Sequence, residues 1–339
     1  MYVSVKTHFD FERGTIRMKK YAFKGFCLVL AVALIISCFS GCAKINYVTD
    51  GAIQAINEIK DGSWKEDKTA EGEGAGNDVN APVIDALTPG TYGGVKMDTI
   101  EDVVKYYVEA YDYSKSLTAQ YKNSEGGTET WYKLLGEEKL SVSNILIDGS
   151  SNAVIEKMVP GIVDGIYSPG LNGLPPCRNR TPEMDVDDNN ESLQKSRLVA
   201  DDLVAANVKD NGDGTITIQM QPKAAEMSSP GLDSQGHLFT SLGAIDAVVD
   251  GISALKWSQG TTADNCKVNY YGGTATVTIN TKTKEITSAE YIMKAYVNVT
   301  HASIAVIKDK SASLDINYTV KYPASDKYLM DSKQATRIS

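Results

Sequence analysis

The chain has 339 residues, of which 42% are hydrophobic and 23% are charged, so it has enough apolar material to form a folded core. Its formal net charge is −9, and binding phosphates requires a surplus of Lys and Arg on one face. The composition therefore fits one large domain or two smaller ones, and it argues against nucleic acid as a partner.

An uninterrupted apolar run extends from Phe26 to Ile36 and follows Lys19, Lys20 and Lys24. A basic segment followed by such a run is the order found in a secretory signal peptide. The run is shorter than the about 20 apolar residues of a membrane-spanning helix. We therefore expect residues 1–41 to be a signal peptide, with Met18 as an alternative start.

Small residues stand directly before Cys42, in the order Ser40-Gly41-Cys42. This order resembles the lipobox of bacterial lipoprotein signal peptides, although Phe39 departs from the family pattern. The resemblance implies that Cys42, or alternatively Cys38, is lipidated. The expected location is the cell membrane, with the protein held by its covalent lipid and facing outside the cytoplasm.

The leader also changes the charge and thiol content of the remaining chain. Residues 1–41 contain six basic and two acidic side chains, so the rest carries a net charge of −13. Two cysteines remain beyond the lipidation site, Cys177 and Cys266, which either form a disulfide or stay as separate thiols. Because C-x-x-C spacing is absent, the sequence carries no redox or zinc motif of that type.

Composition divides the expected mature chain into three parts. Residues 42–64 contain the lipidated cysteine and a short helix, on which three isoleucines fall at helical spacing. Residues 65–94 are rich in Gly and acidic residues, which predicts a flexible linker. Residues 95–339 are expected to form a single α+β domain.

Two helices and a long loop are expected in the first half of this domain. The clearer helix spans 98–121, with Asp98 as its cap and Glu101 three residues later. The second spans 152–166, where Pro160 ends or kinks it. The Pro- and Gly-rich segment that follows, through residue 192, is expected to be the least structured part of the domain.

The second half is predicted to be β-sheet. The segment 210–214 is typical of a hairpin turn between strands at 207–209 and 215–220. Apolar residues then alternate with polar ones over 275–279, 291–299 and 312–322. The fold class that follows is α+β, a long-stranded, curved antiparallel meander, similar to a half-barrel and covered on one face by helices.

Motifs for chemistry are weak. Asp185-x-Asp187-x-Asn189 matches the opening of a calcium loop, but Asn190 and Ser196 replace the Gly and the Glu that such a loop requires. A solvated acidic loop is therefore the better interpretation. Beyond the leader the chain has two histidines, His237 and His301, and no H-E-x-x-H motif. We accordingly expect no catalytic activity, no metal and no cofactor.

The layout is loosely similar to that of LolA-like lipoprotein carriers, whose open half-barrel holds acyl chains beneath helices, and the leader resembles that of Gram-positive surface lipoproteins. The first hypothesis is therefore a non-enzymatic lipoprotein that binds or carries a hydrophobic ligand on the apolar sheet face. The candidate ligand-facing residues are Tyr291, Met293, Val297, Leu314 and Ile316. The alternative is a sensory or interaction module with a fully packed core, whose partner is another envelope protein.

Overall fold

The computed structural model describes residues 78–123, 126–151, 156, 170–177, 179–243, 249–250, 255–304, 307–331 and 335–338. The expected signal peptide, both candidate lipidation sites and the expected helix over 42–64 lie outside these residues. So does the helix expected over 152–166, except for Glu156. Within the described part of the chain, no helix is long and apolar enough to cross a membrane.

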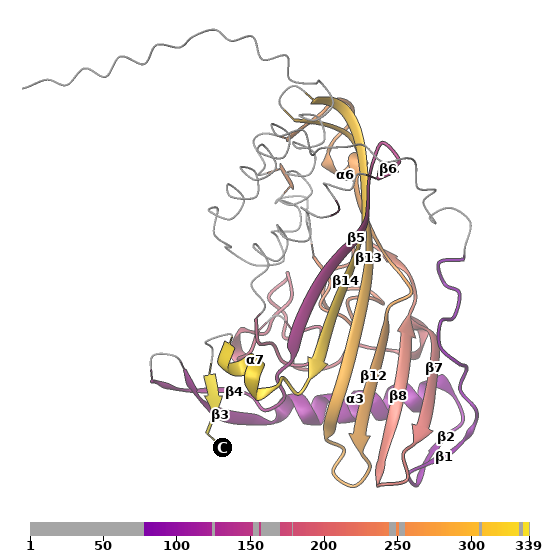
Figure 1. Cartoon of the computed structure of the whole chain (residues 1–339). Coiled ribbons are helices and arrows are strands. Elements are labelled where there is room, and N and C mark those ends of the chain that lie inside the picture. Colours follow the sequence, from indigo (N-terminus) through magenta and orange to yellow (C-terminus); the bar gives the residue numbers. More distant parts are fainter. Residues whose placement is uncertain are drawn as a thin grey trace, which may run out of the picture.

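The described residues form a predominantly antiparallel β structure around one large, open sheet (Figure 1). Its main path runs in the order β6-β5-β14-β13-β12-β8-β7. The bounds are β5 Glu137–Ile147, β6 Ser150–Ser151, β7 Leu203–Asp210, β8 Thr215–Pro222, β12 Thr274–Asn280, β13 Ile286–Ile304 and β14 Ile307–Tyr322. The expected long-stranded antiparallel sheet is thus confirmed, and the described residues are mostly β.

Three further strands join the sheet, namely β10 Leu255–Trp257 and β11 Cys266–Tyr270, which pair with β13, and β9 Ala225–Glu226, which pairs with β11. The long strand β13 pairs along one edge with β14 and along the other with β12, β11 and β10 in succession. The three alternating apolar rows of the sequence are β12, β13 and β14, as predicted. The predicted hairpin is β7–β8, with Gly212 and Gly214 at positive φ in its turn.

The two faces of the sheet differ as strand alternation requires. Along β13, Tyr291, Met293, Ala295, Val297 and Val299 are buried, whereas the residues between them are half-buried or exposed. The buried hydrophobic side chains of β14, β12 and β5, and Ile216, Ile218 and Met220 of β8, belong to the same hydrophobic cluster. We call the apolar side the inner face and the polar side the outer face.

Helix α3, Ile100–Ser116, contacts β7 and β13 and crosses the lower part of the sheet (Figure 1). It begins one residue later than expected, because Thr99 is the cap and forms a capping box with Asp102. It also ends earlier than expected, since Leu117 has an extended backbone and β3, Thr118–Asn123, follows directly. Tyr121, expected on the helix, therefore lies in a strand.

The remaining described elements flank the large sheet. Strand β3 pairs with β4, Thr128–Tyr132, and with β15, Ala335–Arg337. Two short α-helices are α6, Thr262–Asn265, and α7, Asp326–Asp331, and two 3₁₀ turns span Pro182–Met184 and Ala200–Asp202. A second hydrophobic cluster forms around Trp131, Tyr132 and Leu171.

The folded domain starts earlier than the sequence predicted. Strand β1, Gly90–Tyr92, lies within the expected linker and pairs with β2, Val95–Met97. Gln221 of β8 binds the backbone on either side of Pro82, through the N–H of Val83 at 2.7 Å and the carbonyl of Ala81 at 2.9 Å. Asn207 and Asp210 of β7 make further bonds to this segment. Residues 78–94 therefore belong to the fold, and the prediction of a flexible linker over 65–94 is wrong for this part of it.

Candidate functional site

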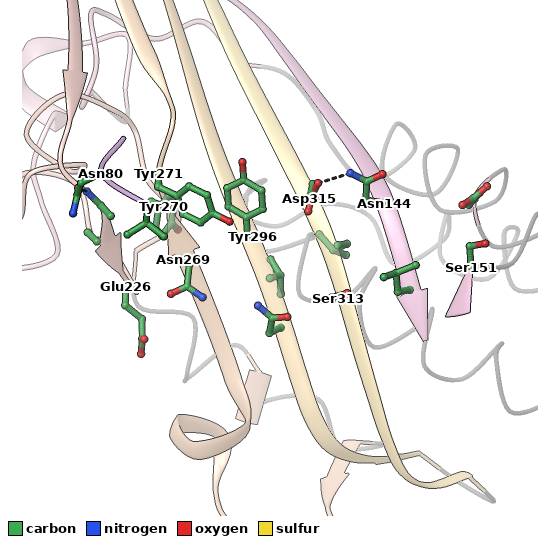
Figure 2. A pocket seen from close by; sticks show the side chains of 18 residues that line it. Asn80, Asn144, Ser151, Glu226, Asn269, Tyr270, Tyr271, Tyr296, Ser313 and Asp315 are labelled. Carbon is green, nitrogen blue, oxygen red and sulfur yellow. Dashed lines mark hydrogen bonds between the residues drawn. The ribbon is translucent and has the colours of Figure 1, made fainter. Parts of the chain in front are cut away.

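The outer face carries two successive rows of polar side chains whose positions follow from the strand register. In one row, Asn269 of β11 lies opposite Tyr296 of β13, and Tyr296 lies opposite Asp315 of β14. In the next row, Asn298 lies opposite Ser313. Figure 2 shows the side chains of Asn269, Tyr296, Asp315 and Ser313 on neighbouring strands, with Asn144 of β5 bonded to Asp315 beyond the end of the first row.

These rows form the floor of an open groove with a volume of about 940 Å³. One wall consists of Val79, Asn80 and residues 224–226, and Ser151 of β6 lies at the other side. The backbone N–H of Ala224 binds the Asn80 side chain at 2.8 Å, which fixes the first described residues against this wall. We call this feature the outer groove. A smaller groove of about 370 Å³ lies beside β7 and β8, near Tyr92 and Lys209.

A stacked pair of tyrosines lies in the outer groove. The rings of Tyr271 and Tyr296 are 4.0 Å apart between centroids and inclined by 13°. Burial raises the pKa of both phenols, and for each of them the neighbouring Asp315 carboxylate adds to the effect. Both side chains therefore remain neutral, half-buried aromatic groups on an otherwise hydrophilic surface.

The structure places the five candidate ligand-facing residues together on the inner face of the described sheet, where their side chains are packed, although Val297 and Leu314 are also among the residues that line the outer groove. Their exposures are 1% for Tyr291, Met293 and Ile316, and 2% for Val297 and Leu314. A side chain that lines a ligand-sized cavity would retain surface accessible to a water molecule. The Tyr291 hydroxyl instead lies 2.9 Å from that of Tyr107 on α3. These residues therefore belong to a packed core.

The two remaining cysteines do not form the disulfide that the sequence left open. Both thiols are free and buried, and they lie in different hydrophobic clusters. Burial raises the pKa of Cys177 to about 12, so its thiol stays protonated and donates to the carbonyl of Asn179. Cys177 is therefore a structural thiol.

A buried ion pair is the main polar feature that sequence reasoning missed. Lys115, in the last turn of α3, places Nζ 2.6 Å from Oδ2 of Asp185, and their side chains are 1% and 0% exposed. The Tyr132 hydroxyl donates to the same oxygen at 3.0 Å, and its ring lies 4.3 Å from the ammonium. The signal in the sequence was the spacing of Tyr107, Tyr111 and Lys115, which places a lysine on the apolar stripe.

The loop that matches a calcium motif is held by protein groups. Oδ1 of Asp187 accepts from the backbone N–H groups of Asn189 and Glu191, and Oδ2 accepts from Arg197 at 2.8 Å. Desolvation alone would raise the pKa of Asp187, but these donors hold it below its ordinary value. The expected solvated acidic loop is therefore wrong at Asp185 and Asp187, which are buried and paired.

The two histidines are each paired with a carboxylate. Nδ1 of His237 lies 2.8 Å from Asp202, and Nδ1 of His301 lies 2.7 Å from Asp309. Ser258 donates to the Asp309 carboxylate, not to the imidazole, so the three side chains do not form a nucleophile–base pair. Within the described ranges, no three His, Cys, Asp or Glu side chains are grouped to hold a metal ion.

Comparison with protein-family models, with curated proteins and with solved structures finds no match for this chain. The outer groove is therefore assigned from its own geometry and chemistry.

Proposed function

We propose that this protein is a lipid-anchored, extracytoplasmic binding protein that takes a polar ligand in the outer groove. It is non-enzymatic and carries no cofactor. The observation that supports this role is the gathering of half-buried tyrosines and amide side chains in a groove of about 940 Å³, on the face that is open to solvent.

The packed inner face favours this function over transport of a hydrophobic ligand inside the domain. A lipid would have to displace Tyr107 from Tyr291 and separate α3 from β13. The expected cover of the whole inner face by helices remains part of the proposal, supported by the contacts of α3. A sensory or interaction module with a fully packed core is the second hypothesis from the sequence, after the carrier of a hydrophobic ligand.

The proposed anchor is compatible with a ligand in the cell envelope. Lipidation at Cys42 leaves 35 residues before Asp78, where the described fold begins. These residues span at most about 120 Å when fully extended. The domain can therefore reach material well beyond the membrane surface while its lipid stays inserted.

The test compares two extracts of bacterial envelopes, the aqueous fraction and the lipid fraction, by the thermal stability of the full-length protein in detergent micelles. The aqueous fraction should raise the melting temperature, because a ligand that binds only the folded state stabilises it. Tyr296→Ala should reduce this rise at a given concentration of the fraction, whereas Tyr113→Ala, on the exposed side of α3, should preserve it. Stabilisation by the lipid fraction alone would refute the proposal and restore the carrier hypothesis.

A further inference from the structure

The outer groove has the chemistry of a carbohydrate site, and we infer that its ligand is an uncharged oligosaccharide. This inference rests on the proposed function and specifies its ligand class. Three properties of the groove carry it: an aromatic pair, neutral side chains that make no hydrogen bond to the described part of the chain, and the sign of the charges along the lining.

The aromatic pair provides the apolar part of the site. A sugar ring has one face of C–H groups and a rim of hydroxyls, so it matches an aromatic surface that is surrounded by polar groups. Tyr271 and Tyr296 present such a surface, because their stacked rings are half-buried in the middle of the polar floor (Figure 2). Their two hydroxyls make no hydrogen bond within the described residues and can bind the rim of the ring.

Neutral donors and acceptors surround this pair. Asn269 lies directly opposite Tyr296, and Asn298 and Ser313 form the adjacent row. The side chains of these three residues make no hydrogen bond to the described part of the chain, although all three line the groove. An Asn amide offers both donors and an acceptor, and a serine hydroxyl offers both as well. Sugar hydroxyls require this combination, because each one donates and accepts.

The charges in the groove oppose an anionic ligand. The described residues that line the groove include no Lys, Arg or His, but they do include Asp315 and Glu226. The Asp315 carboxylate accepts from Asn144 at 2.6 Å, and Glu226 pairs at 2.8 Å with Lys267 of β11. Lys267, which lies opposite Asn298 in the strand register, offsets the charge of Glu226. The carboxylates that disfavour phosphates and uronates are thus Asp315 and Glu156, together with the net charge of −13 beyond the leader. A ligand without negative charge is therefore selected.

The dimensions suit a chain of sugars more than a single ring. The first row crosses the sheet from β11 through β13 and β14 to β5, which is three inter-strand spacings, or about 14 Å. The volume of about 940 Å³ is at the upper end of the roughly 300–1,000 Å³ found for small-molecule sites. A short oligosaccharide can therefore lie across the strands with one ring on the tyrosine pair.

The experiment measures binding of the full-length protein in micelles to an array of neutral hexasaccharides, built from hexoses and N-acetylhexosamines, and to hexagalacturonate as the anionic counterpart. At least one neutral chain should bind, and hexagalacturonate should not. Tyr296→Ala should weaken the binding roughly 2- to 12-fold, as expected for one aromatic contact. Asn298→Ala should also weaken it, whereas Asn317→Ala, on the outer face outside the groove, and Tyr113→Ala should not.

Any of three outcomes would overturn the inference: no neutral chain binds, hexagalacturonate binds as tightly as the neutral chains, or binding does not change in Tyr296→Ala. If the aqueous envelope fraction still stabilises the protein in a Tyr296-dependent manner, the binding function stands and the ligand is of another class. If the aqueous fraction has no effect either, the proposed function fails together with the inference.

Discussion

The buried pair of Lys115 and Asp185 allows a quantitative test of how the domain is held together. Asp185→Asn keeps an acceptor for Tyr132 but leaves the Lys115 ammonium without its anion at 1% side-chain exposure. Breaking a buried pair in this way costs about 3–5 kcal/mol, because the remaining charge cannot return to water. Since domains are stable by only about 5–15 kcal/mol, this variant should lose much of its resistance to urea.

The second mutation should restore most of that loss. In Lys115→Met/Asp185→Asn neither side chain is charged, and a methionine fills about the same volume as the lysine stem. We therefore expect the double variant to be more stable than Asp185→Asn alone, with a coupling energy of several kcal/mol in a double-mutant cycle. Urea unfolding at pH 7 gives the free energies, and an unchanged m-value shows that the same structure unfolds. Additive losses would refute the assignment of a desolvated pair.

Three further predictions test other parts of the chain. Val297→Asp should lower the free energy of unfolding by more than about 3 kcal/mol, because it buries a charge. Asn298→Asp, at the neighbouring position on the outer face, should change the urea midpoint little. Equal losses of stability in the two variants would contradict a sheet with one buried and one solvent-facing side. Cys42→Ala should abolish incorporation of labelled fatty acid and release the protein, whereas label retained with Cys38 intact identifies Cys38 as the acceptor. The pKa of Asp187 is lowered in the folded state, so its contribution to stability is present above the unfolded pKa of about 3.9 and is lost as the pH falls through the folded pKa. Asp187→Asn should therefore flatten the decline of the urea midpoint between about pH 5 and 3.

The elements predicted correctly are those whose signal is local. The turn at 210–214 and the alternating rows of β12, β13 and β14 depend on residues next to one another in the chain. The end of α3 was missed, because the apolar stripe continues through Leu117 and Tyr121 while the backbone already turns extended. Periodicity reports which side of a segment is buried, and it does not distinguish a helix from a strand near such a boundary.

The features missed depend on partners far away in the sequence. The Pro- and Gly-rich segment 170–177 is buried, although it was expected to be the least structured part. Glu138 accepts from the N–H of Gly170 at 2.8 Å and from the Asn172 amide at 2.6 Å, and the Tyr322 hydroxyl donates to Gly173. The outer groove likewise exists only once the register of four strands is known, so neither feature can be derived from local composition.

The pairing of β14 with β5 has a consequence for how the chain assembles during synthesis. Strands β13 and β14 meet through a short connection, so this hairpin closes with little loss of chain entropy. Asn144 and Asp315, in contrast, meet across 171 positions, and β14 is among the last strands to be made. Strand β5 can therefore pair with β14 only after most of the chain has been synthesised. This order predicts slow folding, limited by the formation of these distant contacts. A newly made chain that ends before β14 would expose the unpaired edge of β13 and is the species most prone to aggregate.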